Sequence, residues 1–160
     1  MAQHGMARPE STELLTDLQC LNIAPEDGPV RDYQFRHKLD GQGLVSRKTI
    51  QSGKGRRLYR YQYTYNRQQL PRKKVLKNRK GQKLLTSRYR YNGKGQLKRQ
   101  TVQDGQGLTV RTIQYKYHRK GQLREEIHHS VVNAEHFRIQ YRYDRKGRLK
   151  NTVRTDLNAP

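Results

Sequence analysis

Tyrosine and the basic residues dominate the candidate chemistry of this 160-residue sequence, which holds 11 Tyr and no Trp. Most tyrosines come in Tyr-X-Tyr pairs with Arg, Lys, Thr or Gln at X. Aromatic rings flanked by cations stack on nucleobases, at about 1 to 3 kcal/mol per base, and also take sugar rings by face contact. The candidate aromatic-face residues are Tyr61, Tyr63, Tyr65, Tyr89, Tyr91, Tyr115, Tyr117, Tyr141 and Tyr143.

The basic residues are concentrated after residue 30. The chain has 35 Lys and Arg against 13 Asp and Glu, a formal net charge of +22, but its first 30 residues hold one base and five acids. A strongly basic sheet face is the electrostatic footprint of a phosphate- or sulfate-bearing partner. The candidate polyanion-binding residues are Arg60, Arg72, Lys73, Lys74, Lys77, Arg79, Lys80, Lys83, Arg88, Arg90, Lys116 and Arg142.

Catalytic and metal-binding patterns are weak. The Gly-Lys-Gly turns at 52–56 and 92–95 lack the spacing of a phosphate-binding loop and are interpreted as hairpin turns. Adjacent strand residues point to opposite faces, which separates Glu125 from Glu126 and His128 from His129. No nucleophile, base and orienting group recur together. We therefore predict a non-enzymatic protein without a metal or cofactor.

A repeat of 26 residues positions the tyrosines. One column contains Leu39, Tyr65, Tyr91, Tyr117 and Tyr143, and the column two residues earlier contains His37, Tyr63, Tyr89, Tyr115 and Tyr141. Two turn columns follow, with Gly43, Gln69, Gly95, Gly121 and Gly147 in one and Gly55, Gly81, Gly107 and Asn133 in the other. Asn replaces Gly well where φ is positive, so we expect Asn133 to adopt positive φ.

The turns and the alternation between them predict a mainly β fold. About ten strands should form a repetitive antiparallel β-meander over residues 31–155, as a curved or spiral single sheet, followed by a tail at 156–160. In the acidic segment 1–30, the spacing of Leu14, Leu15, Leu18 and Leu21 predicts a short amphipathic helix, in which Cys20 should be buried. We expect this helix to cap one end of the sheet; docking to a partner and disorder are the alternatives.

The tyrosine side of the sheet must be covered. The candidates are the sheet's own curvature, the amino-terminal helix, a second copy of the chain or a ligand. Tyrosines on one face of a strand usually fill a core, and in that case they should touch across neighbouring repeats. The alternative is the stacking platform described above.

The sequence Tyr141-Arg142-Tyr143-Asp144-Arg145-Lys146-Gly147-Arg148-Leu149 resembles the tyrosine-aspartate repeat, also called the YD or RHS repeat. The copies at 89–97 and 115–123 match it, with Asn92 and His118 in the place of Asp144. The resemblance implies β-hairpins that wind into a spiral sheet, often a shell around a toxin, in secreted or cell-surface proteins that contact carbohydrates or polyanions. It implies no catalytic residue. The 26-residue period is longer than is usual in that family, and five copies are too few to close a shell.

We predict a polyanion-binding β-repeat protein that favours RNA or DNA over an acidic glycan. One alternative is an assembly subunit that pairs by its sheet edges, as a homo-oligomer, or contacts an acidic protein partner. Another is a secreted or surface glycan-binding YD-repeat protein. No apolar run approaches the roughly 20 residues of a membrane span. The single cysteine and the lack of a leader-like start favour a cytoplasmic protein, whereas a removed leader would indicate secretion.

Overall fold

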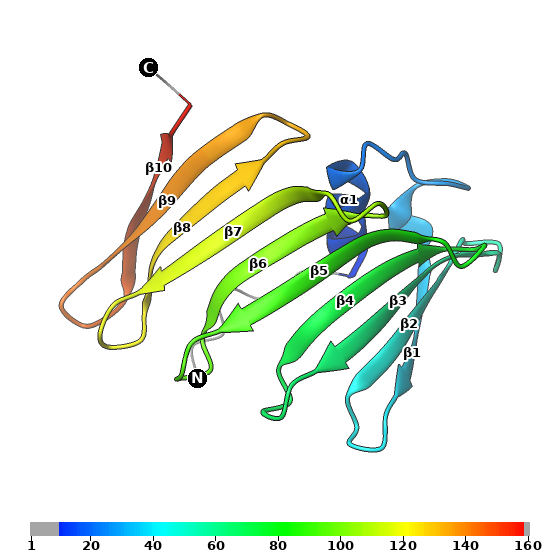
Figure 1. Ribbon diagram of the computed structural model, residues 1–160, viewed down its shortest axis with the longest axis horizontal. Coiled ribbons are helices and arrows are strands. Elements are labelled where there is room, and N and C mark those ends of the chain that lie inside the picture. Colours follow the sequence, from blue (N-terminus) through cyan, green and yellow to red (C-terminus); the bar gives the residue numbers. More distant parts are fainter. Residues whose placement is uncertain (1–9, 159–160) are drawn as a thin grey trace.

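The computed structural model describes residues 10–158, which form one helix and one ten-stranded sheet (Figure 1). The strands pair antiparallel with their neighbours in chain order, without a crossover. The sheet is therefore the predicted single-layer meander. The elements are α1 (Glu10–Cys20), a 3-10 turn (Val30–Asp32), β1 (Gln34–Leu39), β2 (Val45–Gln51), β3 (Arg57–Tyr65), β4 (Pro71–Asn78), β5 (Lys83–Tyr91), β6 (Leu97–Asp104), β7 (Thr109–Tyr117), β8 (Leu123–Ser130), β9 (Glu135–Tyr143) and β10 (Leu149–Asp156).

Most strands are joined by the same five-residue turn, and an Asn or Asp side chain organises it. In the β5–β6 turn, Asn92 Oδ1 accepts the backbone N–H groups of Lys94 and Gln96, each at 3.0 Å. Gly95 has a φ of 76°, a conformation that costs glycine little. The equivalent bonds recur at Asp40, Asn66, Asn78, Asp104 and Asp144. Asp144, which follows Tyr143, therefore acts as a turn residue.

The β8–β9 turn corrects one expectation. Positive φ falls on Ala134, at 51°, and not on Asn133. The Val131 N–H donates to the Val110 carbonyl in β7, so this turn does not repeat the five-residue pattern of the others. The 26-residue column predicts where the turn lies. The residue with positive φ, Ala134, comes one position after the predicted Asn133.

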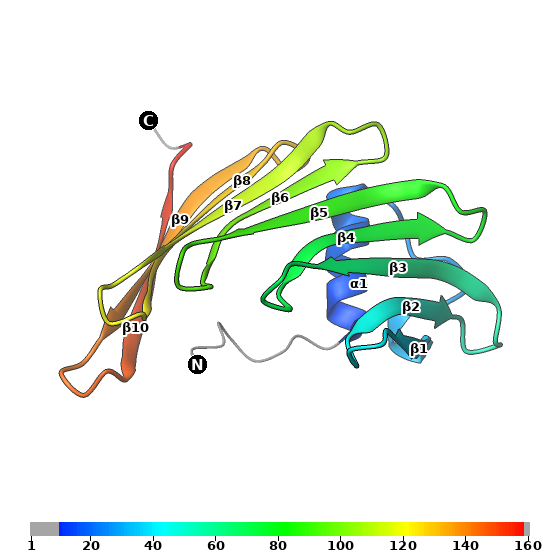
Figure 2. The same cartoon turned by 60° about the horizontal axis from the view of Figure 1, so that its bottom comes forward.

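Helix α1 lies across one face of the sheet and not at its end, which corrects the predicted cap (Figures 1 and 2). Leu14 and Leu18 are fully buried, and Cys20 is buried as predicted. An isolated 11-residue helix is marginal in water, so the sheet must stabilise it. The core between helix and sheet includes Ile50, Leu58, Tyr59, Tyr61, Leu76, Leu85, Val102 and Val110.

The register defines two faces of the sheet. Tyr61 lies opposite Leu76, Leu76 opposite Leu85, and Tyr115 opposite Glu126, so these residues share the side on which α1 packs. We call this side the tyrosine face. The other side we call the basic face; it carries Arg60, Lys73, Lys77, Arg88, Arg90, Arg99, Lys116, Arg138 and Arg142.

Candidate functional site

A buried charge cluster joins α1 to the centre of the tyrosine face. Lys74 Nζ lies 2.8 Å from Asp17 Oδ2 and 2.7 Å from Glu13 Oε1. Asp17 and Lys74 are only 2% and 4% exposed. The Tyr61 hydroxyl donates to Asp17 Oδ2 at 2.5 Å. We call Glu13, Asp17, Lys48, Tyr61 and Lys74 the helix lock, because these groups hold the acidic side of α1 against the sheet.

Lys48 completes the helix lock from β2. Its Nζ lies 3.3 Å from Glu10 Oε1 and 3.4 Å from Glu13 Oε2, and 5.6 Å from the centre of the Tyr61 ring. Burial opposes charge on Glu13, but Lys74 and then Lys48 outweigh it and lower the pKa of this carboxyl. Burial and the charge of Asp17 raise the pKa of Tyr61, so its hydroxyl stays protonated and can donate.

The predicted basic cluster of β4 is divided by the sheet. Lys73 and Lys77 belong to the basic face, and Arg79 and Lys80 lie in the β4–β5 turn. Lys74 was predicted to bind a polyanion, but it is buried under α1 and ion-paired. The prediction for Lys74 is wrong, because neighbouring strand residues point to opposite faces and α1 covers only one of them.

The last tyrosine of each of the strands β3, β5, β7 and β9 makes a structural bond that recurs along the sheet. Its hydroxyl donates to the carbonyl of the residue 20 positions earlier, which begins the preceding strand. The pairs are Tyr65 to Val45 at 2.7 Å, Tyr91 to Pro71 at 2.5 Å, Tyr117 to Leu97, and Tyr143 to Leu123 at 2.6 Å. We call this bond the tyrosine tie; it fastens β3, β5, β7 and β9 each to the strand before it.

The first tyrosines of the pairs differ in their surroundings. Tyr63 is half-buried, and the Tyr141 hydroxyl donates to Glu126 Oε1 at 3.0 Å. Between described residues, tyrosine rings meet only in the pair Tyr61 and Tyr63, whose centres are 5.9 Å apart within one strand. The backbones of the strands that carry tyrosines in neighbouring repeats are about 10 Å apart, because one strand lies between them. Tyr63, Tyr65, Tyr89 and Tyr91 nevertheless line one hollow of about 470 Å³, and contact between tyrosines of neighbouring repeats stays a prediction.

The basic face places like charges directly opposite one another. Arg60 faces Lys77, Lys73 faces Arg88, and Arg90 faces Arg99 across neighbouring strands. Like charges in this position destabilise an antiparallel pair. Lys116 is compensated, since its Nζ lies 2.8 Å from Glu125 Oε1, and Arg142 faces Asn151. The excess charge therefore gathers on β3 to β6.

A small basic hollow lies between β3 and the β4–β5 turn. Its volume is about 220 Å³, and it is lined by Arg57, Tyr59, Arg60, Asn78, Arg79, Lys80 and Gly81, with no carboxylate among these residues. The Nε atom of Arg60 is buried and has no hydrogen-bond partner in the described part of the chain. An oxyanion is the chemical group that would satisfy such a site.

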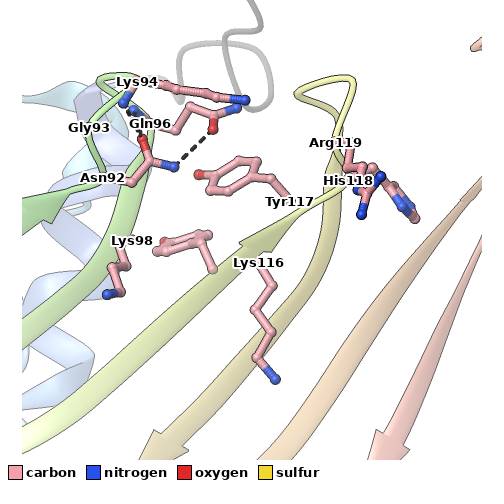
Figure 3. Close-up of a pocket in the computed structure, with 10 residues that line it drawn as sticks. Asn92, Gly93, Lys94, Gln96, Lys98, Lys116, Tyr117, His118 and Arg119 are labelled. Atoms are coloured by element: carbon pink, nitrogen blue, oxygen red, sulfur yellow. Dashed lines mark hydrogen bonds between the residues drawn. The ribbon is translucent and has the colours of Figure 1, made fainter.

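A larger hollow of about 580 Å³ brings tyrosines and cations together between the β5–β6 turn and the end of β7. Figure 3 shows Tyr117 directed toward the turn formed by Asn92 and Gln96, with Lys94 and Lys98 on the same side. Lys116, also in β7, lines the same hollow, and its side chain extends away from Tyr117 (Figure 3).

Sequence reasoning missed the helix lock, although its signals are present. Glu10, Glu13 and Asp17 are spaced i, i+3 and i+7, which places them on one side of a helix beside Leu14 and Leu18. Lys48 and Lys74 are separated by one repeat length of 26 residues, and Gln100 and Glu126 continue the same column. An acidic helix face and two lysines at equivalent positions of neighbouring repeats predict each other as partners.

The two ends of the sheet are edge strands. Within residues 10–158, β1 pairs only with β2 and β10 only with β9. The Leu157 N–H donates to the His136 carbonyl at 2.7 Å. Because backbone bonding alternates along an antiparallel strand, residues 151, 153 and 155 bond to β9, and the backbone groups of Thr152, Arg154 and Asp156 point away from the sheet.

The same range of residues holds no group of three or more His, Cys, Asp or Glu side chains placed to bind a metal ion. No helix between Glu10 and Asn158 has both the length and the apolar character needed to cross a membrane.

Comparisons with known proteins support the fold. No protein-family model and no curated protein sequence matches the chain. Among solved structures, the TcdB2–TccC3–Cdc42 complex matches over 79% of this chain with a TM-score of 0.52 and 14% identity, and the Tc holotoxin pore of Photorhabdus luminescens over 79% with a TM-score of 0.49 and 15% identity. This chain covers 8% of each of those chains. The first likeness supports a YD/RHS-like β-repeat fold.

Proposed function

We propose that the chain is a structural, non-enzymatic unit of a protein assembly, which joins other β-repeat segments through the edges of its sheet. The observation that carries this proposal is the open meander, in which β1 and β10 each have one edge without a partner strand within the described residues. An exposed edge offers a row of backbone donors and acceptors to another strand. The sheet therefore has a built-in means of growing by strand addition.

The exposure of the last repeat supports this role. Leu149 at the start of β10 is 55% exposed, whereas Leu123, one repeat earlier, is 7% exposed. Helix α1 covers the central part of the tyrosine face and leaves β8 to β10 without a helix (Figures 1 and 2). A solenoid needs atypical terminal repeats as caps, and the β9–β10 repeat keeps the regular motif. The similar TcdB2–TccC3–Cdc42 structure contains several proteins by its name, which agrees with a structural role.

The molecular mass of the purified chain as a function of concentration tests this proposal. The protein should be freed of nucleic acid by nuclease and a high-salt wash. We expect the mass to rise with concentration, and Thr152→Pro to suppress the rise, because proline removes an outward N–H without touching the bonds to β9. Lys150→Gln is the control, since it alters charge at the same edge without removing an N–H. A chain that stays monomeric at all concentrations would contradict the proposal.

Polyanion binding is the second candidate function, and the basic hollow at Arg60 favours it. Four cations line a space of about 220 Å³ that has no carboxylate in its lining. The like-charge pairs of the basic face lie on the same and neighbouring strands, and an anion would relieve their repulsion. The basic hollow is suited to a phosphate or sulfate group of a polyanion.

The salt dependence of binding to single-stranded RNA tests the second candidate. The logarithm of the binding constant should fall with the logarithm of salt concentration by about 0.7 per phosphate contacted. Arg60→Gln should reduce the slope, while Arg145→Gln, in the distant β9–β10 turn, should not. If neither RNA nor DNA binds at low salt, nucleic acid is excluded; heparin binding under the same conditions would identify an acidic glycan instead.

A further inference from the structure

The repeated tyrosine tie indicates what kind of strand the β10 edge binds. This inference rests on the assembly role proposed above. Four ties follow one another along the sheet, each with its acceptor 20 residues before its donor. The acceptors Val45, Pro71, Leu97 and Leu123 are 26 residues apart. Each of them is the first residue of an even-numbered strand. The bond is therefore a fixed part of how one repeat receives the next.

The fifth member of the acceptor column lies at the open edge. It is Leu149, the first residue of β10. Among residues 10–158, no tyrosine hydroxyl donates to the Leu149 carbonyl, because β10 is the last strand of the sheet. In the interior repeats this carbonyl faces the strand that follows. The Leu149 carbonyl and the outward backbone groups of Thr152 and Arg154 thus form one continuous edge.

A second copy of this chain does not supply the missing donor from its own edge strands. Strand β1 ends in His37, Lys38 and Leu39, with Leu39 in the column that holds tyrosine in the later repeats. Strand β10 contains no tyrosine. An edge-to-edge pair of two copies would form the backbone bonds and leave the Leu149 carbonyl without its tie.

We infer that the β10 edge binds a β-strand of another protein segment that ends in Tyr-X-Tyr, with the last tyrosine donating to the Leu149 carbonyl. The incoming strand runs antiparallel to β10 and continues the meander as an eleventh strand. Its first tyrosine lies toward Thr152, which carries no carboxylate, whereas Tyr141 in the preceding repeat donates to Glu126, the residue 26 positions before Thr152. Recognition therefore depends on the second tyrosine more than on the first.

A peptide copying Glu135–Tyr143 is the probe for this edge, because it has the sequence of the last Tyr-X-Tyr strand. Its affinity for the full chain is measured by fluorescence anisotropy, beside two matched peptides with phenylalanine in place of Tyr143 or of Tyr141. Loss of one hydrogen bond weakens binding roughly two- to tenfold. We expect this loss for the Tyr143→Phe peptide and little change for the Tyr141→Phe peptide.

The protein variant Thr152→Pro locates the peptide. We expect it to abolish binding of all three peptides, since the outward N–H needed by an added strand is gone. Binding that survives Thr152→Pro would place the peptide elsewhere and overturn the inference. Equal affinity of the Tyr143→Phe and parent peptides would also overturn it, while leaving the assembly role intact if the mass of the chain still rises with concentration. A constant mass together with no peptide binding would remove both proposals.

Discussion

Lys74→Met removes the cation at the centre of the helix lock while keeping a side chain of similar length. Asp17, 2% exposed, then loses a partner at 2.8 Å, and Glu13 loses one at 2.7 Å. Removing one member of a buried ion pair costs about 3 to 5 kcal/mol, because the remaining charge is uncompensated. We expect about 3 kcal/mol here, since Tyr61 still donates to Asp17. The adjacent Lys73→Met should cost less than about 0.5 kcal/mol, because Lys73 has no ion pair among the described residues.

The single cysteine provides the assay. Cys20 ends α1 and is 6% exposed, so a thiol reagent reaches it only when the helix leaves the sheet. A loss of about 3 kcal/mol corresponds to roughly a hundredfold faster labelling, since 1.4 kcal/mol is a factor of ten. The variants must be compared at one pH, because burial raises the pKa of the Cys20 thiol. Urea denaturation followed by circular dichroism measures any global loss in parallel.

If Lys74→Met, Lys73→Met and the parent chain are labelled at equal rates, Lys74 does not hold α1 against the sheet. Adding Asp17→Asn to Lys74→Met sharpens the test, because it removes the stranded carboxylate. The double variant should be more stable than the sum of the single losses predicts. Additive losses would show that the two side chains act independently.

The other predictions concern pH, the turns, the tyrosine ties and the basic face. The folded-state pKa of Glu13 is lowered from 4.5, so its contribution to stability is present above pH 4.5 and lost as the pH falls through the lowered value; the thermal midpoint should fall in acid, and less so for Glu13→Gln. Asn92→Ala should cost about 1 kcal/mol in urea denaturation, because two backbone N–H groups lose their acceptor, whereas an equal stability of variant and parent would rule out the turn role. Tyr91→Phe, which removes the tie to Pro71, should cost about 0.5 to 1.5 kcal/mol in the same assay. Arg88→Gln combined with Arg90→Gln should raise stability at low salt in the absence of polyanion, by relieving the pairs with Lys73 and Arg99; unchanged stability would show that these charges do not interact.

The repeat period predicted the strands and turns because the same local chemistry recurs in each copy. Asn92, Gly95 and the alternating tyrosines determine where a hairpin turns and which side chains share a face, and these are local properties. The period could not place Ala134, since the backbone of the β8–β9 turn bonds to β7 through Val131, a backbone bond that the other turns between residues 10 and 158 do not make. It also did not reveal that the tyrosine hydroxyls would reach the preceding strand.

The candidate site was harder to predict because it depends on what covers each face. Lys73 and Lys74 are neighbours of the same type, yet one belongs to the basic face and the other is buried beneath α1. Charge counts treat them alike. The information that separates them lies in the spacing of Glu10, Glu13 and Asp17 and in the 26-residue step from Lys48 to Lys74, which must be considered together.

Amide hydrogen exchange along β10 is the sharpest test of whether the protein associates by strand addition at this edge. The N–H of Val153 bonds to β9 and should be protected at every protein concentration, whereas those of Thr152 and Arg154 point outward. In nucleic-acid-free protein, we expect the two outward amides to exchange freely when dilute and to become protected as the mass rises. If the mass rises while Thr152 and Arg154 still exchange freely, association occurs through another surface and the claim of strand addition at β10 is contradicted.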